Sequence, residues 1–274
     1  MKITVLAENT TNNPALLTEK GLSLHVDWTG GRLMMDFGFH GGILPNSRIL
    51  GVDLSAVDLG VLSHGHSDHS GGIAAFREVN PTAPIYVQEH AFGSYWAKRP
   101  DGQLNYIGMD PVLREDKNII RCSGVTELPG GALLFDNITG RELFSRANRS
   151  LLSGTGDRMV CDEFCHEQGL ILPLGSGYVL LNGCAHNGIL NIMTRAEELM
   201  GRLPTAVFGG FHLYDPGTED GCDVEFVRAL ARRLLTCPTR YYTGHCTGLS
   251  AWEVLKREMG DTVSYISTGT TIEL

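Results

Sequence analysis

Six consecutive residues carry four side chains that can bind a metal ion, and this run constrains the fold more than any other feature of the chain. The run reads HGHSDH over residues 64–69. It follows Val57–Ser63, whose apolar pattern predicts a buried strand, and precedes a helix predicted over about Gly71–Glu78. A loop held at both ends by regular structure keeps its side chains in fixed positions, as a binding site requires.

The spacing within this run predicts how its side chains are directed. His64 and His66 are two residues apart, so in an extended backbone both rings point the same way and can bind one ion. Asp68 and His69 turn into the helix and can face a second ion, while Gly65 has no side chain to crowd the metal. These groups suit Zn²⁺, with Fe or Mn²⁺ as alternatives. The competing interpretation, solvated histidines beside a helix cap, is disfavoured by the density of the run.

Composition narrows the class of protein. The 274 residues include 22 basic and 31 acidic ones, a formal charge of −9 without a basic cluster, so a broad nucleic-acid-binding surface is not expected. No apolar run approaches the roughly 20 residues of a membrane span, and a hydrophobic content of 42% is enough for a core. Seven scattered cysteines and no recognisable export signal predict reduced thiols and a cytoplasmic location.

The remaining pattern predicts one domain, residues 1–274. Expected strands of the first part are Ile3–Glu8, Leu22–Trp28, Arg32–Phe37 and Pro84–Gln88. Expected strands of the second part are Leu170–Leu174, Tyr178–Leu181, Thr205–Phe208, Arg240–Thr243, Val263–Ile266 and Thr271–Leu274, with helices at Ile189–Met200, Asp223–Leu235 and about Ala251–Met259. Residues 93 to about 160 have weak periodicity, with short apolar stretches around Ile119 and over Ala132–Phe135 as candidate strands, and are interpreted as a lid or insertion. Strands from both parts with outer helices predict an α/β (α+β) fold, a four-layer αββα sandwich.

Six further segments carry a family resemblance. They are LAENTT (6–11), LTEKGLS (17–23), LSHGH (62–66), GCAHNGI (183–189), GGFHL (209–213) and GHCTG (244–248). With the H-x-H-x-D-H run they resemble the metallo-β-lactamase superfamily. Within it they are similar to the subgroup named for 7,8-dihydropterin-6-methyl-4-(β-D-ribofuranosyl)-aminobenzene-5′-phosphate synthases, many members of which carry only the label of a metal-dependent hydrolase. The resemblance implies an αββα sandwich with a one- or two-metal site, usually zinc.

Three histidines that follow strands of the second part are expected to complete this site. His186 is the expected third ligand for the ion of His64 and His66, and its other interpretation is a cap for the helix that follows it. His245 stands where the resemblance places the last ligand. His212 is either a ligand or a neutral hydrogen-bond donor directed at the substrate.

Four other residues are expected at the same edge. Cys184 stands where the superfamily usually has a bridging aspartate, so it is either a ligand or a small buried residue. Asp36 either orients a ligand histidine or forms a turn. Glu8 and Asn9 end the first strand and are expected to line the site. The histidines at 25, 40 and 90 are interpreted as structural, and the CDEFCH segment at 161–166 has a spacing that fits no common zinc motif.

These residues predict a metal-dependent enzyme with a small phosphorylated or otherwise anionic substrate. Metal-bound hydroxide would attack an ester or phosphoester, Asp68 would orient or deprotonate the water, and His212 would stabilise the oxyanion or bind a phosphate. The alternative is a pterin transferase that releases pyrophosphate through the same histidines. A non-catalytic metal-binding module is a third alternative, disfavoured because a closed structural zinc site does not need Asp68. No nucleic-acid or membrane partner is expected, and a homo-oligomer is left open.

Overall fold

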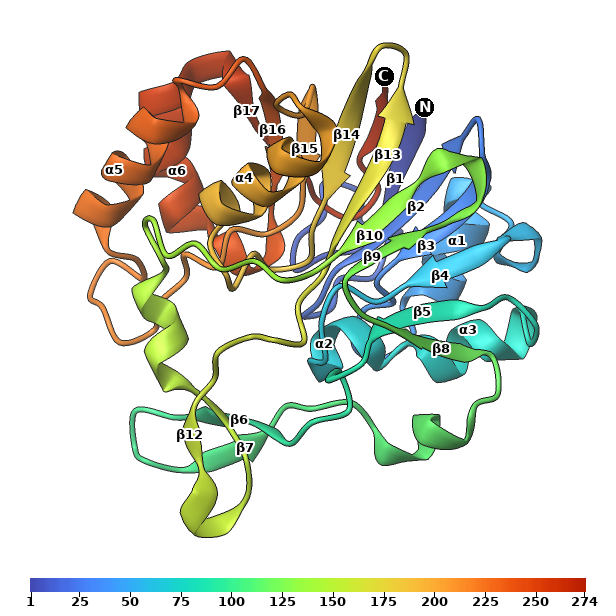
Figure 1. The fold of residues 1–274 in the computed structure, drawn as a ribbon, viewed down its shortest axis with the longest axis horizontal. Helices are drawn as coiled ribbons and strands as arrows, with labels where there is room; N and C mark the ends of the chain where they lie inside the picture. The colour runs from blue at the N-terminus through green and yellow to red at the C-terminus, as the bar shows by residue number, and fades with distance from the viewer.

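Two seven-stranded sheets pack face to face in the computed structural model, which describes residues 1–274 (Figure 1). The first sheet has the order β18-β1-β2-β3-β4-β5-β8. Its strands are β1 (Lys2–Ala7), β2 (Ser23–Trp28), β3 (Gly31–Met35), β4 (Leu59–Val61), β5 (Ile85–Gln88), β8 (Ile119–Cys122) and β18 (Thr271–Glu273). The second sheet has the order β17-β16-β15-β14-β13-β10-β9. Its strands are β9 (Val125–Glu127), β10 (Leu133–Phe135), β13 (Gly169–Leu174), β14 (Gly177–Leu181), β15 (Ala206–Phe208), β16 (Arg240–Thr243) and β17 (Val263–Tyr265).

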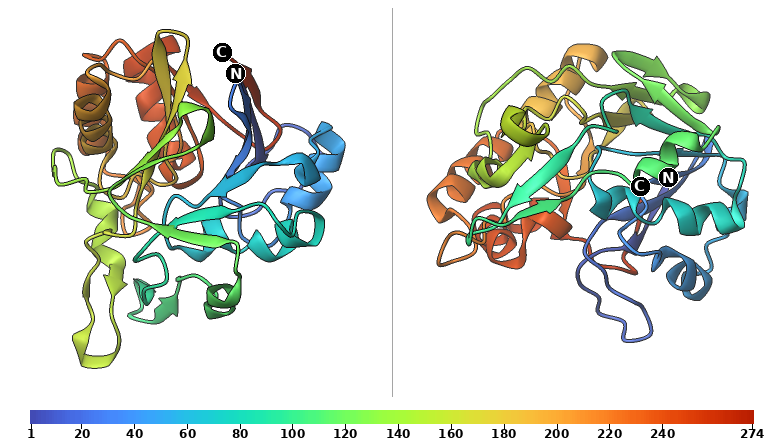
Figure 2. Two further views of the ribbon diagram at one scale, coloured as in Figure 1. Left: turned by 45° about the vertical axis from the view of Figure 1, so that its right-hand side comes forward. Right: turned by 90° about the horizontal axis from the view of Figure 1, so that it is seen from below.

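Helices cover the outer face of each sheet, which gives the expected four-layer αββα sandwich (Figures 1 and 2). The first sheet carries α1 (Ile43–Leu50), α2 (Ser67–Ser70) and α3 (Ile73–Val79), and the second carries α4 (Ile189–Met200), α5 (Val224–Leu234) and α6 (Leu249–Met259). Strand β14 shows that both faces of the second sheet are covered, one by the other sheet and one by the helices. Val179 and Leu181 pack between the sheets, while Tyr178 and Leu180 pack under the helices, and all four are fully buried.

Helix α1 was not expected from the sequence. Its boundary residues explain why it forms and why the sequence pattern did not indicate it. It has only eight residues, begins after Gly42 without a side-chain cap, and carries Pro45 near its start. Proline near the start of a helix and glycine just after its end are typical boundary signals, and Gly51 adopts the left-handed conformation there with φ 70°. The helix is stabilised by packing against the first sheet, since Ile43 is completely buried.

The expected lid at about 93–160 requires a correction, because the structure divides this region. Strands β8, β9 and β10 belong to the two main sheets, with β8 and β9 at an edge and β10 between β9 and β13. Only β6 (Tyr95–Lys98), β7 (Leu104–Tyr106), β11 (Leu151–Ser153) and β12 (Val160–Cys161) form a separate small sheet, which projects from the lower side in Figure 1. The core strands here have three or four residues each, too few for a strong alternation in the sequence.

The two chain ends lie side by side, since β18 pairs with β1 and the Met1 amino group donates to the Leu274 carbonyl at 2.8 Å (Figure 1). No helix combines the length and apolar character needed to cross a membrane.

The division of residues 93–160 predicts that a leucine-to-alanine substitution lowers the free energy of unfolding more in β10 than in β7. Leu134 on β10 is 1% exposed between the main sheets, whereas Leu104 on β7 is 41% exposed. Leu134→Ala should lower the free energy of unfolding by about 2–5 kcal/mol because it leaves a cavity, while Leu104→Ala should change it by less than about 0.5 kcal/mol. Urea denaturation of both variants measures this, and equal costs would contradict the placement of β10 in the core.

Candidate metal centre

Loops at the ends of six strands bring the predicted site residues together at one edge of the sandwich. Strands β14, β15 and β16 are parallel, as are β3 and β4, so the loops after them emerge on the same side. The residues that meet there are Glu8 and Asn9 after β1, Asp36 after β3, His64, His66, Asp68 and His69 after β4, Cys184 and His186 after β14, His212 after β15 and His245 after β16. Several overlapping groups of three among these residues have all their ligand atoms within 4.8 Å of one another.

Three histidines form the first ligand set. The ligand nitrogens of His64, His66 and His186 lie within 4.8 Å of one another, and all three residues are buried. His64 Nδ1 lies 2.8 Å from Ser63 Oγ, whose own hydrogen is donated to Asp36 Oδ2 at 2.7 Å. His64 must therefore donate its Nδ1 hydrogen to Ser63, which leaves a lone pair on Nε2.

His186 has the same arrangement, so two lone pairs face each other in the interior. Its Nδ1 lies 3.1 Å from Asn148 Oδ1, and its Nε2 lies 3.3 Å from His64 Nε2. Burial, reinforced by neighbouring histidines, lowers the pKa of both rings well below the usual value, so no proton lies between them. His66 Nε2 is also buried without a partner. A cation resolves these contacts, and the 3.3 Å separation is close to the roughly 3.4 Å edge between nitrogens of one tetrahedral zinc site.

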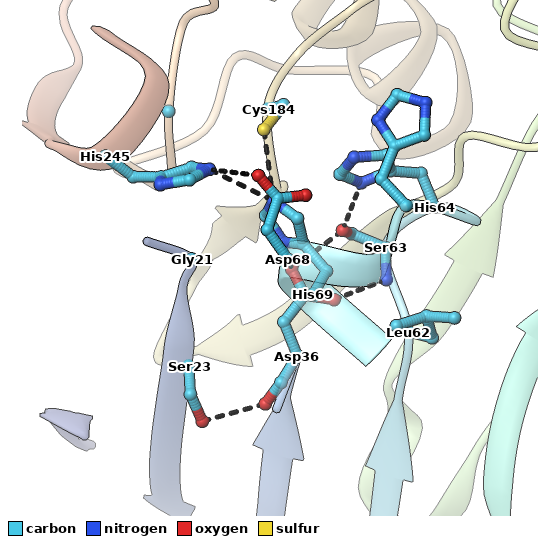
Figure 3. A network of polar contacts seen from close by, with 12 residues as sticks. Gly21, Ser23, Asp36, Leu62, Ser63, His64, Asp68, His69, Cys184 and His245 are labelled. Carbon is cyan, nitrogen blue, oxygen red and sulfur yellow. Dashed lines mark hydrogen bonds and ion pairs between the residues drawn. The ribbon is translucent and has the colours of Figure 1, made fainter. Parts of the chain in front are cut away.

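The second ligand set surrounds His69 (Figure 3). His69 Nδ1 lies 2.7 Å from Asp36 Oδ2, and its Nε2 lies 3.2 Å from His245 Nε2 and 3.1 Å from Cys184 Sγ. Asp68 Oδ2 lies 3.7 Å from His245 Nε2. The Nδ1 of His245 is 2.8 Å from the side-chain oxygen of the asparagine at position 9, so its Nε2 also carries a lone pair directed into the cluster.

Charge on these groups shows that the second set favours positive charge at its centre. Burial alone would lower the pKa of His69, but the Asp36 carboxylate raises that pKa to about 9. In the protein without metal, a proton on His69 thus occupies the space between facing acceptors. Burial would raise the pKa of the Asp68 carboxyl, but the protonated His69, with His245 and Lys20 nearby, holds that pKa well below its usual range.

Three buried carboxylates hold the loops that carry these ligands. Asp36 accepts the Ser63 backbone N–H at 2.7 Å, and Glu8 accepts the His245 backbone N–H at 2.6 Å. Glu167, which the sequence analysis did not identify, accepts the backbone N–H of His186 at 2.7 Å. Each carboxylate therefore fixes the backbone at or next to a candidate ligand histidine, and the contact between Asp36 and His69 Nδ1 at 2.7 Å favours the first of its two expected roles, that of orienting a histidine.

Strained backbone is concentrated in the same loops. Non-glycine residues with positive φ include Asp36 at 61°, Ala185 at 54°, His212 at 46° and His245 at 51°. Such conformations cost about 1–3 kcal/mol each and persist only where surrounding contacts enforce them. Gly183 allows a further close approach, because a Cβ there would lie 2.0 Å from Ser63 Oγ.

His166 lies next to the site, although the spacing of its segment fits no common zinc motif. Its Nδ1 accepts the backbone N–H of Gly65 at 2.9 Å, and its Nε2 lies 3.0 Å from Asp162 Oδ2. Both ring nitrogens are thereby used, so His166 positions the loop between His64 and His66 and is not a ligand. Phe164 in the same segment stacks on His186 with the rings 4.6 Å apart. The spacing of residues 161–166 could not indicate these contacts, because their partners, Gly65 and His186, are distant in sequence.

His212 lies beside both ligand sets without a partner for either ring nitrogen. Its ring centroid is 4.2 Å from that of His186, and its backbone N–H donates to Cys246 Sγ at 3.3 Å. The histidines at 25, 40 and 90 lie elsewhere, the first within β2 and the other two exposed at the surface. A cavity of about 600 Å³ lies behind the His186 loop, lined in part by Phe164 and Glu167, and it contains no ligand side chain.

Comparisons with known proteins agree with this geometry. The family model of the metallo-β-lactamase superfamily matches residues 26–133. Over these residues the chain is similar to members of the metallo-β-lactamase superfamily. Over the whole chain and 96% of the relative it is 26% identical to the 7,8-dihydropterin-6-methyl-4-(β-D-ribofuranosyl)-aminobenzene-5′-phosphate synthase of Methanocaldococcus jannaschii.

Two solved structures show the same fold. The crystal structure of a metal-dependent hydrolase of the β-lactamase superfamily has a TM-score of 0.81 and 25% identity, covering 100% of this chain and 99% of that one. Zn²⁺-bound PqqB from Methylobacterium extorquens, at 11% identity and a TM-score of 0.59, covers all of both chains and shares the fold alone.

The role of Glu167 predicts a loss of metal affinity on its removal. Glu167→Ala leaves the buried backbone N–H of His186 without its acceptor, so zinc affinity should fall about 10- to 100-fold, as is usual when a group that orients a ligand is removed. Competition with a chromogenic chelator measures the affinity. Glu163→Ala, at an exposed position of the same segment, is the control and should bind zinc as the unaltered protein does. Equal affinities in both variants would contradict the role.

The proton on His69 predicts how metal affinity depends on pH. A raised pKa of about 9 means that His69 is protonated at neutral pH and must lose that proton before it binds an ion. Zinc affinity of the second set should therefore gain about tenfold per pH unit from this residue between pH 7 and 8.5. Asp36→Asn removes the carboxylate that holds the proton and should make the dependence shallower by about one proton. The same slope in both proteins would show that His69 is neutral.

Proposed function

We propose that this protein is a metal-dependent hydrolase that acts on an ester or phosphoester bond of a small anionic molecule. The observation that carries the proposal is the open side of the ligand cluster. The Asp68 side chain is 17% exposed there, while the two ring nitrogens of His212 are buried and have no hydrogen-bond partner. A closed structural site would bury all its ligands and leave no unpartnered donor beside them.

The two ligand sets fit two ions, with His64, His66 and His186 holding one and Asp68, His69 and His245 the other. Zinc bound there would supply a Lewis acid and lower the pKa of a coordinated water to about 7. The surrounding hydrogen bonds already select the correct tautomer of each ligand, because Ser63 and Asn148 accept the Nδ1 hydrogens of His64 and His186. No further rearrangement of these rings is required.

Asp68 is suited to orient a water molecule. The low pKa keeps its carboxylate ionised at neutral pH, and its exposed side can accept a hydrogen bond from water in the open part of the site. Lys20 approaches the same carboxylate at 3.7 Å and is 69% exposed, so it can also contact an anionic substrate. A carboxylate with so low a pKa is a weak proton acceptor, which favours orientation over deprotonation.

His212 is suited to bind the reacting group of the substrate. Its backbone is fixed on both sides, since its N–H donates to Cys246 Sγ and its carbonyl accepts from Ser145 Oγ at 2.5 Å. A ring N–H held in this way can donate to a developing oxyanion or to a phosphate oxygen.

A transferase is the second candidate, and the full-length similarity to the pterin-related synthase favours it. In that reaction an arylamine ribotide would displace pyrophosphate from the methyl carbon of a pterin. A carbon–oxygen bond breaks, a bond from the nucleophile to that carbon forms, and the nucleophile loses a proton. The same ligands would serve, with His212 contacting the leaving diphosphate.

Removal of one ligand should separate metal binding from folding. His66→Ala should lower metal content and abolish activity, because the first ligand set loses one of its three nitrogens. The urea midpoint of the metal-free variant should stay close to that of the metal-free unaltered protein. His90→Ala, at an exposed position outside the site, is the matched control. Full activity in metal-free His66→Ala protein would contradict the proposal, and elemental analysis with the activity assay decides it.

A coupled assay distinguishes the two reactions. We expect hydrolysis of generic esters or phosphodiesters without a second substrate. Pyrophosphate release that requires both a pterin diphosphate and an aminobenzene ribotide would favour the transferase instead. Neither activity in fully metal-loaded protein would favour a non-catalytic metal-binding module.

A further inference from the structure

The Cys184 thiol lies between the two ligand sets. Its Sγ is 3.1 Å from His69 Nε2, and it forms groups within 4.8 Å with the ligand atoms of His64, of His186 and of His245. The residue is 3% exposed, and Figure 3 shows its side chain directed at His69 from the opposite loop. A sulfur atom in this position is within reach of ions held by either set.

Hydrogen bonding alone does not account for this position. The facing atoms are the Nε2 atoms of His69 and His245, 3.2 Å apart, with the Cys184 sulfur beside them. Their Nδ1 hydrogens are committed to Asp36 and Asn9. One thiol hydrogen or one histidine proton can satisfy a single contact among these acceptors, whereas a metal ion satisfies all of them at once.

Charge balance also favours a thiolate. Two divalent ions bring four positive charges into a buried site, and Asp68 is the one carboxylate among the expected ligands. The carboxylates of Asp36, Glu8 and Glu167 are directed at backbone N–H groups and the outer side of the histidines. Buried charge is costly unless it is paired, so a second anionic ligand between the ions would stabilise the occupied centre.

The backbone on both sides of Cys184 is closely constrained. Gly183 packs against Ser63, where a Cβ would lie 2.0 Å from Oγ, and Ala185 has a φ of 54°. The neighbouring thiol of Cys246 is used differently, since it accepts the His212 backbone N–H and approaches the Cys184 carbonyl at 3.6 Å. Cys246 Sγ also lies within 4.8 Å of the ligand atoms of Cys184 and His245, so variants of both cysteines are needed to assign the sulfur ligand.

We propose that Cys184 binds as a thiolate between the two ions and makes the centre selective for Zn²⁺, Fe²⁺ or Co²⁺ over Mn²⁺ and Mg²⁺. The inference rests on the proposed metal-dependent function and goes beyond it in naming the bridging ligand and the class of metal. On binding, a metal–sulfur bond forms and the thiol proton passes to solvent. Soft thiolate ligands favour these metals, whereas carboxylate and water ligands favour Mn²⁺ and Mg²⁺.

Spectroscopy of the unaltered chain tests the proposal without relying on a variant that folds. The full-length protein is loaded with two equivalents of Co²⁺ or Zn²⁺. We expect a near-ultraviolet sulfur-to-cobalt charge-transfer band and, at the zinc edge, a sulfur shell at about 2.3 Å beside the nitrogen shell. Two bound ions with nitrogen and oxygen neighbours only would overturn the thiolate while leaving the hydrolase proposal intact. Failure to bind either metal would refute the hydrolase proposal itself.

Variants then assign the sulfur. Cys184→Ser should abolish the charge-transfer band and reduce the preference for Zn²⁺ over Mn²⁺ at least tenfold. Cys222→Ser, at a cysteine equally buried under the helices far from the site, should leave both unchanged. Persistence of the band in Cys184→Ser with its loss in Cys246→Ser would overturn the assignment. Each variant is first checked for cooperative urea unfolding, and the sulfur shell of the unaltered protein decides if Cys184→Ser does not fold.

Discussion

Buried carboxylates that accept backbone N–H groups are the interaction on which the rest of the site depends. Ligand histidines that converge in the interior bring their lone pairs close together, and nothing in their own chemistry favours that arrangement before a metal binds. Asp36, Glu8 and Glu167 hold three loops in place through hydrogen bonds of 2.6–2.7 Å. Hydrogen bonds to charged acceptors are worth about twice those between neutral groups. These bonds oppose the repulsion between ligands and the backbone strain at Ala185 and His245.

The sandwich explains how distant segments supply one site. Each half contributes parallel strands whose ends lie at the same edge, so the loops that follow these strands place their histidines there. Val179 and Leu181 pack against the other sheet and thereby align the two halves. The first ligand set crosses the interface between the sheets through His64 and His186, and the second crosses it through His69 and His245. Metal binding therefore connects the two halves as well as completing the site.

Much of the fold could be predicted from the sequence because its periodicity is local. Helix α4 was predicted with its observed limits, and α5 differs by one residue at each end, since apolar spacing and boundary residues such as Gly201 and Asp223 are visible in the chain. The H-x-H-x-D-H run was recognisable for the same reason. Glu167 and His166 were not, because their roles exist only through contacts with His186 and Gly65, which are distant in sequence. The apolar stretches that form β8 and β10 were recognisable as candidate strands, but their membership of the main sheets was not, because it depends on pairing with β5 and β13.

The pairing of β18 with β1 bears on the order in which the site can form. Glu8 follows β1 and holds the His245 loop, but β1 gains its outer neighbour only from residues 271–273. On the ribosome, the first sheet therefore has an unpaired edge until these residues have emerged, and the second ligand set cannot be held in place before residue 245 has been added. Contacts of such long sequence separation form late and slowly. The second candidate ligand set is therefore expected to be completed late in folding.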